Sequence, residues 1–428
     1  MKEIKIGLLG LGNIGTGTYK TLEMNRDIIE KNVGTKVNIV KILEKDVDRE
    51  RDITVSKDQF VSDPEDIFTD PEIDIVIELL GGVEPAASLM ERAMDCGKHV
   101  VTANKAAVAA NYPKLTEAAK RNGVMFKFEA SVGGGIPVLT SLAGAARANR
   151  YTEVLGIVNG TTNYILHMMS EEGMDYEEAL KDAQAKGFAE ADPTADVEGI
   201  DAANKLSILM ALMFDKYVHP DDIPTTGIKK ITKEKIAEAK TNDCVIKLIA
   251  SAKKEKGGKN VSVRVSPAFI KNASQLAGVS DVFNAVLVRG NAVGDVVFYG
   301  RGAGKMPTAS AVVADIIDCA KHIEKRKNIG WENSIDGYVL DAGEFESSFY
   351  VRINGKKEDV TAAFSGVKFL NRENAPEDEV AFVVSEINKT RNLLFKTFAV
   401  MLNNFISQNF SQVTASGRIS DSTCAATD

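Results

Sequence analysis

A glycine-rich turn after the first apolar run constrains the fold of this chain more than any other feature. The segment "IKIGLLGLGNIGTGTYKTL" carries the pattern G-x-G-x-x-G at Gly10, Gly12 and Gly15. The first glycine permits a tight turn, the second lets the backbone approach a pyrophosphate, and the third allows a helix to pack closely on the strand. The helix that begins near Asn13 and Ile14 then presents its N-terminus to the phosphates. The position after the first strand favours a dinucleotide site over a glycine-rich turn that binds nothing.

Apolar runs of strand character recur along the first part of the chain, and helical stretches separate the later ones. The expected strands cover residues 36–43, 73–82, 98–103 and 124–130, and the helical stretches cover residues 85–97 and 112–123. Alternation of strand and helix predicts a parallel, doubly wound α/β sheet of the Rossmann type over residues 1–130. Ligands of such sheets lie beyond the carboxyl ends of the strands, where "ELLGG" and "TANK" fall.

Lys105 in "VTANK" follows an expected strand directly and lies at a helix start. A positive charge is mildly unfavourable at a helix N-terminus. This placement at a ligand-facing edge favours a functional lysine over an ordinary surface lysine.

The end of the second expected strand bears on the choice of coenzyme. Glu44 follows "VNIVKIL", and a carboxylate there binds the ribose 2′-hydroxyl and repels a 2′-phosphate. This favours NAD. Lys45, Arg49 and Arg51 are close in sequence and could hold the 2′-phosphate of NADP, so both coenzymes stay open.

The segment 187–209, "GFAEADPTADVEGIDAANKLSIL", places a lysine on an apolar helix. Asp201 and Lys205 share a face with Ile208 and Leu212. A solvated Asp–Lys pair would contribute only a few tenths of a kcal/mol and have no function. Lysines are rarely buried without partners, however, so the sequence predicts a cleft that holds this lysine with acids. The carboxylates of the segment are Glu190, Asp192, Asp196, Glu198 and Asp201.

Composition excludes several classes of protein. The 428-residue chain has a net charge of −8 and no basic stripe, which argues against nucleic-acid binding. Its four cysteines are far apart in sequence and suggest neither a zinc site nor a disulfide framework. No apolar run approaches membrane-spanning length, and the start lacks a signal-peptide pattern. We therefore expect a cytoplasmic protein.

Seven motifs together resemble the homoserine dehydrogenase family over about residues 3–325. They are "GLGNIGTG", "IELLGG", "VTANK", "EASVGGGIPV", "VNGTTNYIL", "GFAEADPTADVEGIDAANKL" and "GRGAGKMPTASAVVADI". The resemblance implies reversible NAD(P)-dependent reduction of L-aspartate 4-semialdehyde to L-homoserine. It also implies a Rossmann domain of residues 1–130 with 307–325, then an α+β substrate and dimerisation domain of residues 131–306 around a mixed sheet. A homodimer or dimer of dimers is expected.

The same resemblance implies roles for the charged residues. Lys205 would donate the proton to the carbonyl oxygen, and Lys105 would lie near the nicotinamide and the reacting centre. Glu190 and Asp201 would bind the substrate through its ammonium or an ordered water. The chemistry agrees, because hydride addition builds negative charge on an oxygen that a nearby ammonium can stabilise and protonate.

Backbone groups complete the implied sites. Gly187 would serve both substrate and coenzyme, and Gly302 would close over the coenzyme before a helix that returns to the first domain. Lys305 departs from the family pattern, which is apolar or uncharged there. In "NGTTN" we expect a turn, with Thr161 or Thr162 capping the next helix.

The segment "EASVGGGIPV" matches a monovalent-cation site of the family. Glu129 and the carbonyl groups of Val132, Gly134 and Ile136 would bind Na⁺ or K⁺, which oxygen ligands suit. A flexible hinge between the domains is the simpler interpretation, and both can hold together.

The last part of the chain, residues 345–412, has the expected order β, α, β, β, α and resembles a small ACT-like α+β domain. The place of the usual Asp-x-Pro-Gly turn reads "INGKKEDV", without Pro-Gly. Amino-acid sensing, subunit docking and a purely structural extension all stay open. Residues 413–428 read as a polar tail.

Two other functions compete with the family assignment. A different Rossmann oxidoreductase of amino-acid aldehydes would keep the glycine loop but would not need the acids and lysine of segment 187–209. A non-catalytic dinucleotide-binding regulatory protein predicts a broken site, whereas all the expected charged residues are present.

Overall fold

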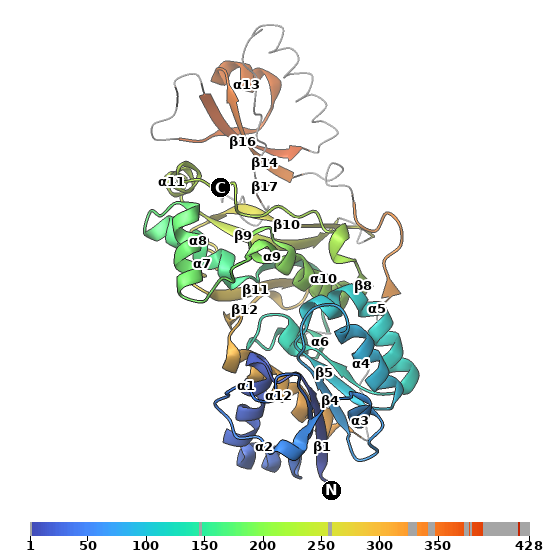
Figure 1. Cartoon of the computed structure of the whole chain (residues 1–428). Coiled ribbons are helices and arrows are strands. Elements are labelled where there is room, and N and C mark those ends of the chain that lie inside the picture. The colour runs from blue at the N-terminus through green and yellow to red at the C-terminus, as the bar shows by residue number, and fades with distance from the viewer. Residues whose placement is uncertain are drawn as a thin grey trace.

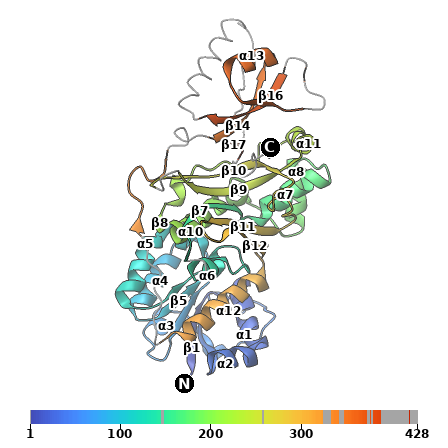
Figure 2. The same ribbon diagram turned by 180° about the vertical axis from the view of Figure 1, so that it is seen from behind.

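The computed structural model describes residues 2–144, 148–255, 259–323, 332–340, 347–371, 376, 379–387 and 418–419. Figures 1 and 2 show three layers of structure stacked from the N-terminus upward: a parallel sheet with helices, an antiparallel sheet with helices, and a small C-terminal sheet. No helix among the described residues combines the length and the apolar character needed to cross a membrane.

The first domain is a six-stranded parallel sheet in the order β3-β2-β1-β4-β5-β6, as predicted for a Rossmann fold. Its strands are β1 (Ile4–Leu9), β2 (Val37–Leu43), β3 (Phe60–Val61), β4 (Ile75–Glu78), β5 (His99–Thr102) and β6 (Phe126–Lys127). Helices α1 (Asn13–Met24), α2 (Arg26–Val33) and α12 (Lys305–Lys321) share a core with one face, and α3 (Glu65–Phe68), α4 (Ala86–Asp95) and α5 (Lys105–Asn122) share a core with the other.

Helix α12 comes from far along the chain yet packs beside α1, as the two views show. Val312, Ile316 and Cys319 are fully buried there against Ile6 and Leu8 of β1. Their burial explains why an apolar helix follows the second domain in the sequence, because it completes the core of the first.

The second domain contains a five-stranded sheet in the order β10-β9-β7-β11-β12. Its strands are β7 (Tyr151–Ile157), β9 (Cys244–Lys254), β10 (Val261–Lys271), β11 (Phe283–Gly290) and β12 (Gly294–Arg301). All four pairings are antiparallel, so the implied mixed sheet is wrong. The chain connects β9 to β10 and β11 to β12 as antiparallel neighbours, and a parallel pair would need a long crossover.

Helices cover one face of this sheet. They are α6 (Val138–Ala143), α7 (Gly160–Glu171), α8 (Tyr176–Ala185), α9 (Thr194–Val197), α10 (Ile200–Phe214) and α11 (Lys233–Thr241). Helix α10 is buried on nearly every side and belongs to one core cluster with Val108 and Tyr112 of α5. The cores of the two domains therefore meet at α5 and α10. Short strands β8 (Lys216–Tyr217) and β13 (Glu332–Asn333) pair in parallel beside them.

The C-terminal sheet has the order β15-β16-β14-β17. It is formed by β14 (Ser347–Asn354), β15 (Val367–Phe369), β16 (Glu379–Ile387) and β17 (Arg418–Ile419), with helix α13 (Lys357–Ala363). The order β, α, β, β agrees with the first four expected elements. The expected last helix lies outside the described residues, so an ACT-like domain stays a prediction. Within the segment interpreted as a polar tail, Arg418 and Ile419 pair with β14.

The C-terminal module contacts the second domain through β14. The Tyr350 ring lies edge-on to Phe269 of β10, with centroids 5.3 Å apart, and its hydroxyl donates to Glu238 of α11. These contacts attach the module to the face of the molecule away from the glycine loop (Figure 1).

Candidate active site

Lys105 is the first residue of α5, and a buried polar network determines where that helix starts. Asn104 caps α5 and donates to the carbonyl oxygen of Gly82 at 2.7 Å and to the Glu78 carboxylate at 3.4 Å. Glu78 is fully buried at the end of β4 and accepts the Thr102 hydroxyl at 2.7 Å. Because this network sits at the carboxyl ends of β4 and β5, it directs Lys105 away from the sheet toward α10.

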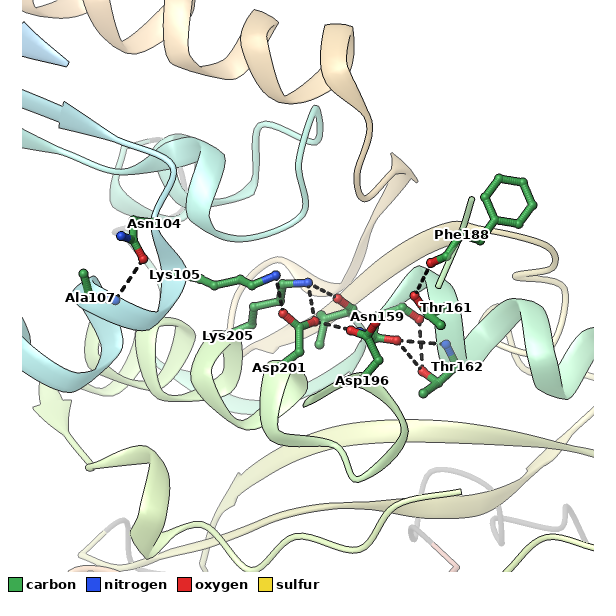
Figure 3. Close-up of polar contacts among 11 residues, drawn as sticks. Asn104, Lys105, Ala107, Asn159, Thr161, Thr162, Phe188, Asp196, Asp201 and Lys205 are labelled. Atoms are coloured by element: carbon green, nitrogen blue, oxygen red, sulfur yellow. Dashed lines mark hydrogen bonds and ion pairs between the residues drawn. The ribbon is translucent and has the colours of Figure 1, made fainter. Parts of the chain in front are cut away.

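Asp201 and Lys205 lie one turn apart on α10 and are buried, with 3% and 7% of their surfaces exposed. Lys205 Nζ donates to Asp201 Oδ2 at 2.7 Å and to the carbonyl oxygen of Val158 at 2.6 Å. Lys105 Nζ lies 2.6 Å from Asp201 Oδ1. Figure 3 shows the two lysines reaching this carboxylate from two helices. The structure therefore brings both lysines to one buried carboxylate at the boundary of the domains, whereas a cleft at this cluster stays a prediction.

Burial and charge act against each other in this cluster. Burial would raise the pKa of Asp201, but Lys205 and Lys105 hold that pKa well below its usual range. Burial lowers the pKa of Lys205, although Asp201 opposes the shift. Burial also acts to lower the pKa of Lys105, but its pairing with Asp201 wins and the net shift is upward. The pKa of Lys205 is thus shifted downward and that of Lys105 upward, so Lys205 releases its proton more easily than Lys105 does.

Asn159 brings a further element into the site. Its side-chain nitrogen donates to Asp201 Oδ2 at 2.8 Å and to Asp196 Oδ1 at 2.6 Å. Its oxygen accepts the backbone N–H of Thr162, so Asn159 caps α7. The expected cap at Thr161 or Thr162 is wrong. Thr162 is the third residue of the helix, and the side chain of Asn159, just before the helix, is placed to accept its N–H.

The loop after α8 carries Gly187 and Glu190. Both residues are exposed, and Gly187 adopts φ +74°, which favours glycine. Thr161 donates its hydroxyl to the carbonyl oxygen of Phe188 at 2.7 Å, which ties the loop to α7 (Figure 3). The charge of Glu190 contributes to the upward pKa shift of Lys105, so this carboxylate acts on Lys105 through space.

The glycine loop has the features that a pyrophosphate needs. Gly10 has φ +94°, and a side chain at Gly15 would lie 2.2 Å from the Gly10 carbonyl oxygen. Among the described residues, no atom lies within 4 Å of a side chain added at Gly12, so space is open in front of the loop. Helix α1 has neither a side-chain cap nor an acidic residue in its first turn. Its N-terminal N–H groups therefore suit an anionic ligand.

A cavity of about 100 Å³ adjoins this loop. It is lined by Leu11, Gly12, Asn13, Thr16, Arg49, Glu50, Arg51, Asp52 and Lys305. Lys305, the departure from the family pattern, begins α12 and pairs with Asp52 at 2.6 Å. Glu44 lies beside the cavity, where its carboxylate accepts the backbone N–H of Leu11 at 2.8 Å and of Asp46 at 3.0 Å.

Gly302 and Gly134 meet where the second domain returns to the first. A side chain at Gly134 would lie 2.6 Å from the carbonyl oxygen of Gly302, and its φ is +55°. The neighbouring Glu129 is buried, and its carboxylate accepts the backbone N–H groups of Leu139 at 2.9 Å and Thr140 at 2.6 Å. Glu129 thus stabilises the start of α6, a role that the sequence did not reveal.

The sequence named the lysines and acids of this site but missed the amides that orient them. Lys105, Asp201 and Lys205 come together, and the charge of Glu190 acts on Lys105. Asn104 and Asn159 were not singled out. Each directly precedes the first residue of a helix, and an asparagine in that position is the available sequence signal.

Three comparisons with known proteins agree with this geometry. The chain is 39% identical to the homoserine dehydrogenase of Bacillus subtilis (strain 168), over 94% of this chain and 96% of that protein. It is 46% identical to the homoserine dehydrogenase of Synechocystis sp., over 74% and 73% of the two chains. The crystal structure of a homoserine dehydrogenase from Thiobacillus denitrificans superposes with a TM-score of 0.87 at 34% identity, covering 98% of both chains.

The Rossmann domain and its match to an NAD-binding family model define an NAD(P)-dependent oxidoreductase. Residues 10–129 match the family described as "Homoserine dehydrogenase, NAD binding domain", and residues 137–317 match that described as "Homoserine dehydrogenase". The chain belongs to the homoserine dehydrogenase family. The alternatives of another aldehyde oxidoreductase and of a non-catalytic regulator are not favoured.

Proposed function

We propose that Lys205 is the proton donor in the reversible reduction of L-aspartate 4-semialdehyde to L-homoserine. The observation that carries this proposal is the geometry of its ammonium, which is buried between the domains and held by Asp201 and the Val158 carbonyl oxygen. Two acceptors leave one N–H of the ammonium for a substrate oxygen. The lowered pKa of Lys205 favours release of that proton.

The coenzyme, when bound, supplies the hydride. The chain itself stabilises the charge that then develops on the carbonyl oxygen, because Lys205 and Lys105 bring two positive charges to one cleft. Lys205 gives its proton to that oxygen, and Asp201 holds the lysine in place throughout. In the oxidative direction neutral Lys205 accepts the hydroxyl proton of homoserine.

The substrate is a zwitterion, and the site offers both signs of charge. We propose that Glu190 binds its ammonium, with Gly187 letting the loop approach substrate and coenzyme. Both oxygens of Asp201 already bind lysines or Asn159, so Asp201 contributes to substrate binding through an ordered water or through the lysines it holds. Lys105 lies at the reacting centre on the coenzyme side.

NAD is the proposed coenzyme. Glu44 keeps a carboxylate beside the cavity at the glycine loop, where it would repel a 2′-phosphate. Arg51 donates to the backbone carbonyl oxygens of Leu11, Arg49 and Asp46. Because these carbonyl groups hold the Arg51 guanidinium, Arg49 and Lys45 are the better candidates to contact a 2′-phosphate. The pyrophosphate would lie against Gly10, Gly12 and the α1 N-terminus, with Gly302 covering the coenzyme from the other side.

A monovalent cation at Glu129 is a further proposal. Burial raises the pKa of Glu129, and it raises that of the adjacent Asp315 to about 7, although Lys127 opposes both shifts. A bound cation would favour both carboxylate forms. The carbonyl oxygens of Val132, Gly134 and Ile136 supply neutral ligands of the kind that Na⁺ or K⁺ takes, although that of Ile136 already accepts the Val138 N–H at 2.8 Å. If the cation binds, KCl should stimulate turnover of the wild type more than that of Glu129→Gln.

We propose that two copies of the chain associate through the sheet of the second domain. Edge strand β12 exposes the apolar residues Val297 and Tyr299. Tyr299→Asp should convert a dimer to a monomer in light scattering, whereas Ile335→Asp, which changes an exposed apolar residue elsewhere, should not. A sensing role for the C-terminal module and a cytoplasmic location stay predictions.

The proposed function is tested by absorbance at the nicotinamide band with purified protein and L-homoserine. NAD and NADP are supplied separately at alkaline pH, with and without K⁺ or Na⁺. We expect homoserine-dependent reduction, with the higher kcat/KM for NAD. Glu44→Gln keeps an acceptor for the Leu11 N–H and should reduce the preference for NAD over NADP. The coenzyme proposal would be contradicted if the wild type preferred NADP and Arg49→Ala abolished that preference.

A further inference from the structure

Asn159 lies between two acids of the site, and its side-chain nitrogen bonds to both. Its nitrogen donates to Asp201 Oδ2, the same oxygen that Lys205 binds. We propose that Asn159 is a positioning residue that keeps Asp196 and Asp201 together as carboxylates and thereby sets the pH at which Lys205 exchanges its proton. This inference rests on the proposed role of Lys205.

The orientation of the Asn159 amide follows from its hydrogen bonds. Its oxygen accepts the backbone N–H of Thr162 at 2.8 Å and the Thr162 hydroxyl at 2.9 Å. A backbone N–H can only donate, so the oxygen must face α7 and the nitrogen must face the acids. Asn159 is itself buried, with 5% of its surface exposed. Both N–H groups of the amide are therefore used on carboxylates.

Only an asparagine performs both tasks at this position. Aspartate, serine and threonine also cap helices, but none of them offers two donors to neighbouring carboxylates. An aspartate would place a third carboxylate about 3 Å from two others, and added negative charge there would favour the ammonium form of Lys205. The choice of the amide therefore matters for the charge of the site as well as for the start of α7.

The charged groups that face Lys205 come from three helices. Asp201 lies on its own helix, Lys105 on α5 and Asp196 on α9, while Glu190 in the loop after α8 acts on Lys105. Asp201 favours the ammonium form of Lys205, and Lys105 disfavours it. The hydrogen bond that Asn159 donates to Asp201 Oδ2 weakens the attraction between that oxygen and the Lys205 proton. Without it, Lys205 keeps its proton to higher pH.

The test measures kcat for homoserine oxidation against pH, because this direction needs neutral Lys205. Asn159→Asp adds a carboxylate beside Asp201. It should move the rising limb of the curve of kcat against pH to higher pH by about one to three units. Asn159→Ser keeps a helix cap and loses both donations to the acids, so it should move the limb in the same direction by less. Serine also provides the test if the aspartate variant does not fold.

Asn163 offers a matched control on the same helix. Its buried amide nitrogen donates to the carbonyl oxygens of Val279, Asp281 and Phe283 at 3.2, 2.9 and 3.1 Å, away from the acids. Asn163→Ala should lower the thermal stability and leave the rising limb in place, which is the effect expected from removing an asparagine with a purely structural role.

Two outcomes separate this inference from the proposed function. If folded Asn159→Asp and Asn159→Ser give the wild-type profile while Lys205→Ala abolishes the limb, the inference is wrong and the role of Lys205 stands. If Lys205→Ala retains both the rate and the limb, the role of Lys205 fails, and the inference fails with it.

Discussion

Lys105 and Asp201 join the two domains through an ion pair in which Nζ and Oδ1 are 2.6 Å apart. Lys105 begins α5 of the parallel-sheet domain, and Asp201 lies in the first turn of α10. The other oxygen of Asp201 binds Lys205 of the same helix. One buried carboxylate therefore holds two ammonium groups at the boundary of the domains, so its charge controls the ionisation of both.

Removing that charge should shift the pH dependence in the direction opposite to Asn159→Asp. In Asp201→Asn, the main group that favours the charged form of Lys205 is gone and only the weaker effect of Asp196 remains, while burial continues to favour the neutral amine. The pKa of Lys205 falls further, and the rising limb of homoserine oxidation moves to lower pH. The plateau rate also falls, because both lysines lose a partner. Glu91→Gln, which breaks a partly exposed pair with Lys114, is the control. A limb that stays in place or moves upward would show that Asp201 does not set the ionisation of Lys205.

Loss of the proposed proton donor should affect the chemical step alone. Lys205→Ala is expected to lower kcat by roughly two to four orders of magnitude, as for a lost general acid. Coenzyme affinity, followed by quenching of protein fluorescence, should stay near the wild-type value because the glycine loop is untouched. Lys98→Met removes another buried lysine, which donates to the Ile73 carbonyl oxygen at 2.8 Å, and should change stability without changing kcat. A near-normal kcat in Lys205→Ala would remove this lysine from the mechanism.

Two glycines of the same loop should respond differently to the same substitution. A methyl group at Gly12 meets no atom within 4 Å in the part of the chain that the structure describes, so Gly12→Ala should fold with a stability change below about 0.5 kcal/mol. It should raise the KM for the coenzyme at least roughly tenfold, about 1.4 kcal/mol of binding, because the methyl group fills the space left for the pyrophosphate. Gly15→Ala instead collides with the Gly10 carbonyl oxygen and should lower the melting temperature. Equal KM values for the wild type and Gly12→Ala would place the pyrophosphate elsewhere.

The sequence predicted the residues whose chemistry is unusual for their setting. Each of three residues is uncommon in its setting: Gly10 in the turn after a strand, Lys105 at a helix start and Lys205 on an apolar helix. The structure brings the two lysines to one carboxylate. Glu78 carried no such signal. It ends an apolar strand, and its burial depends on Thr102 of the neighbouring strand and on Asn104, which meet only after folding.

Whether neighbouring strands of the second domain run parallel or antiparallel could also not be predicted from the sequence. The implied mixed sheet is wrong because strand pairing depends on how β7 packs between β9 and β11, which are separated from it by helices or by another hairpin. The period of apolar residues fixes which face of a strand is buried, but it carries no information on the direction of the neighbour.

Lys247 of β9 should give the protein a stability that increases with pH. Its buried ammonium donates to the Asn163 side-chain oxygen at 3.2 Å and to the Val279 carbonyl oxygen, and burial lowers its pKa to about 8. Between that value and the ordinary 10.5, the unfolded chain binds a proton that the folded chain has released, so folding becomes more favourable as pH rises. The unfolding free energy of the wild type minus that of Lys247→Met should be flat below about pH 8 and then rise by up to about 1.4 kcal/mol per pH unit. Urea titrations of both proteins across this range measure the difference. A difference that stays constant with pH would mean that Lys247 keeps its proton in the folded protein throughout.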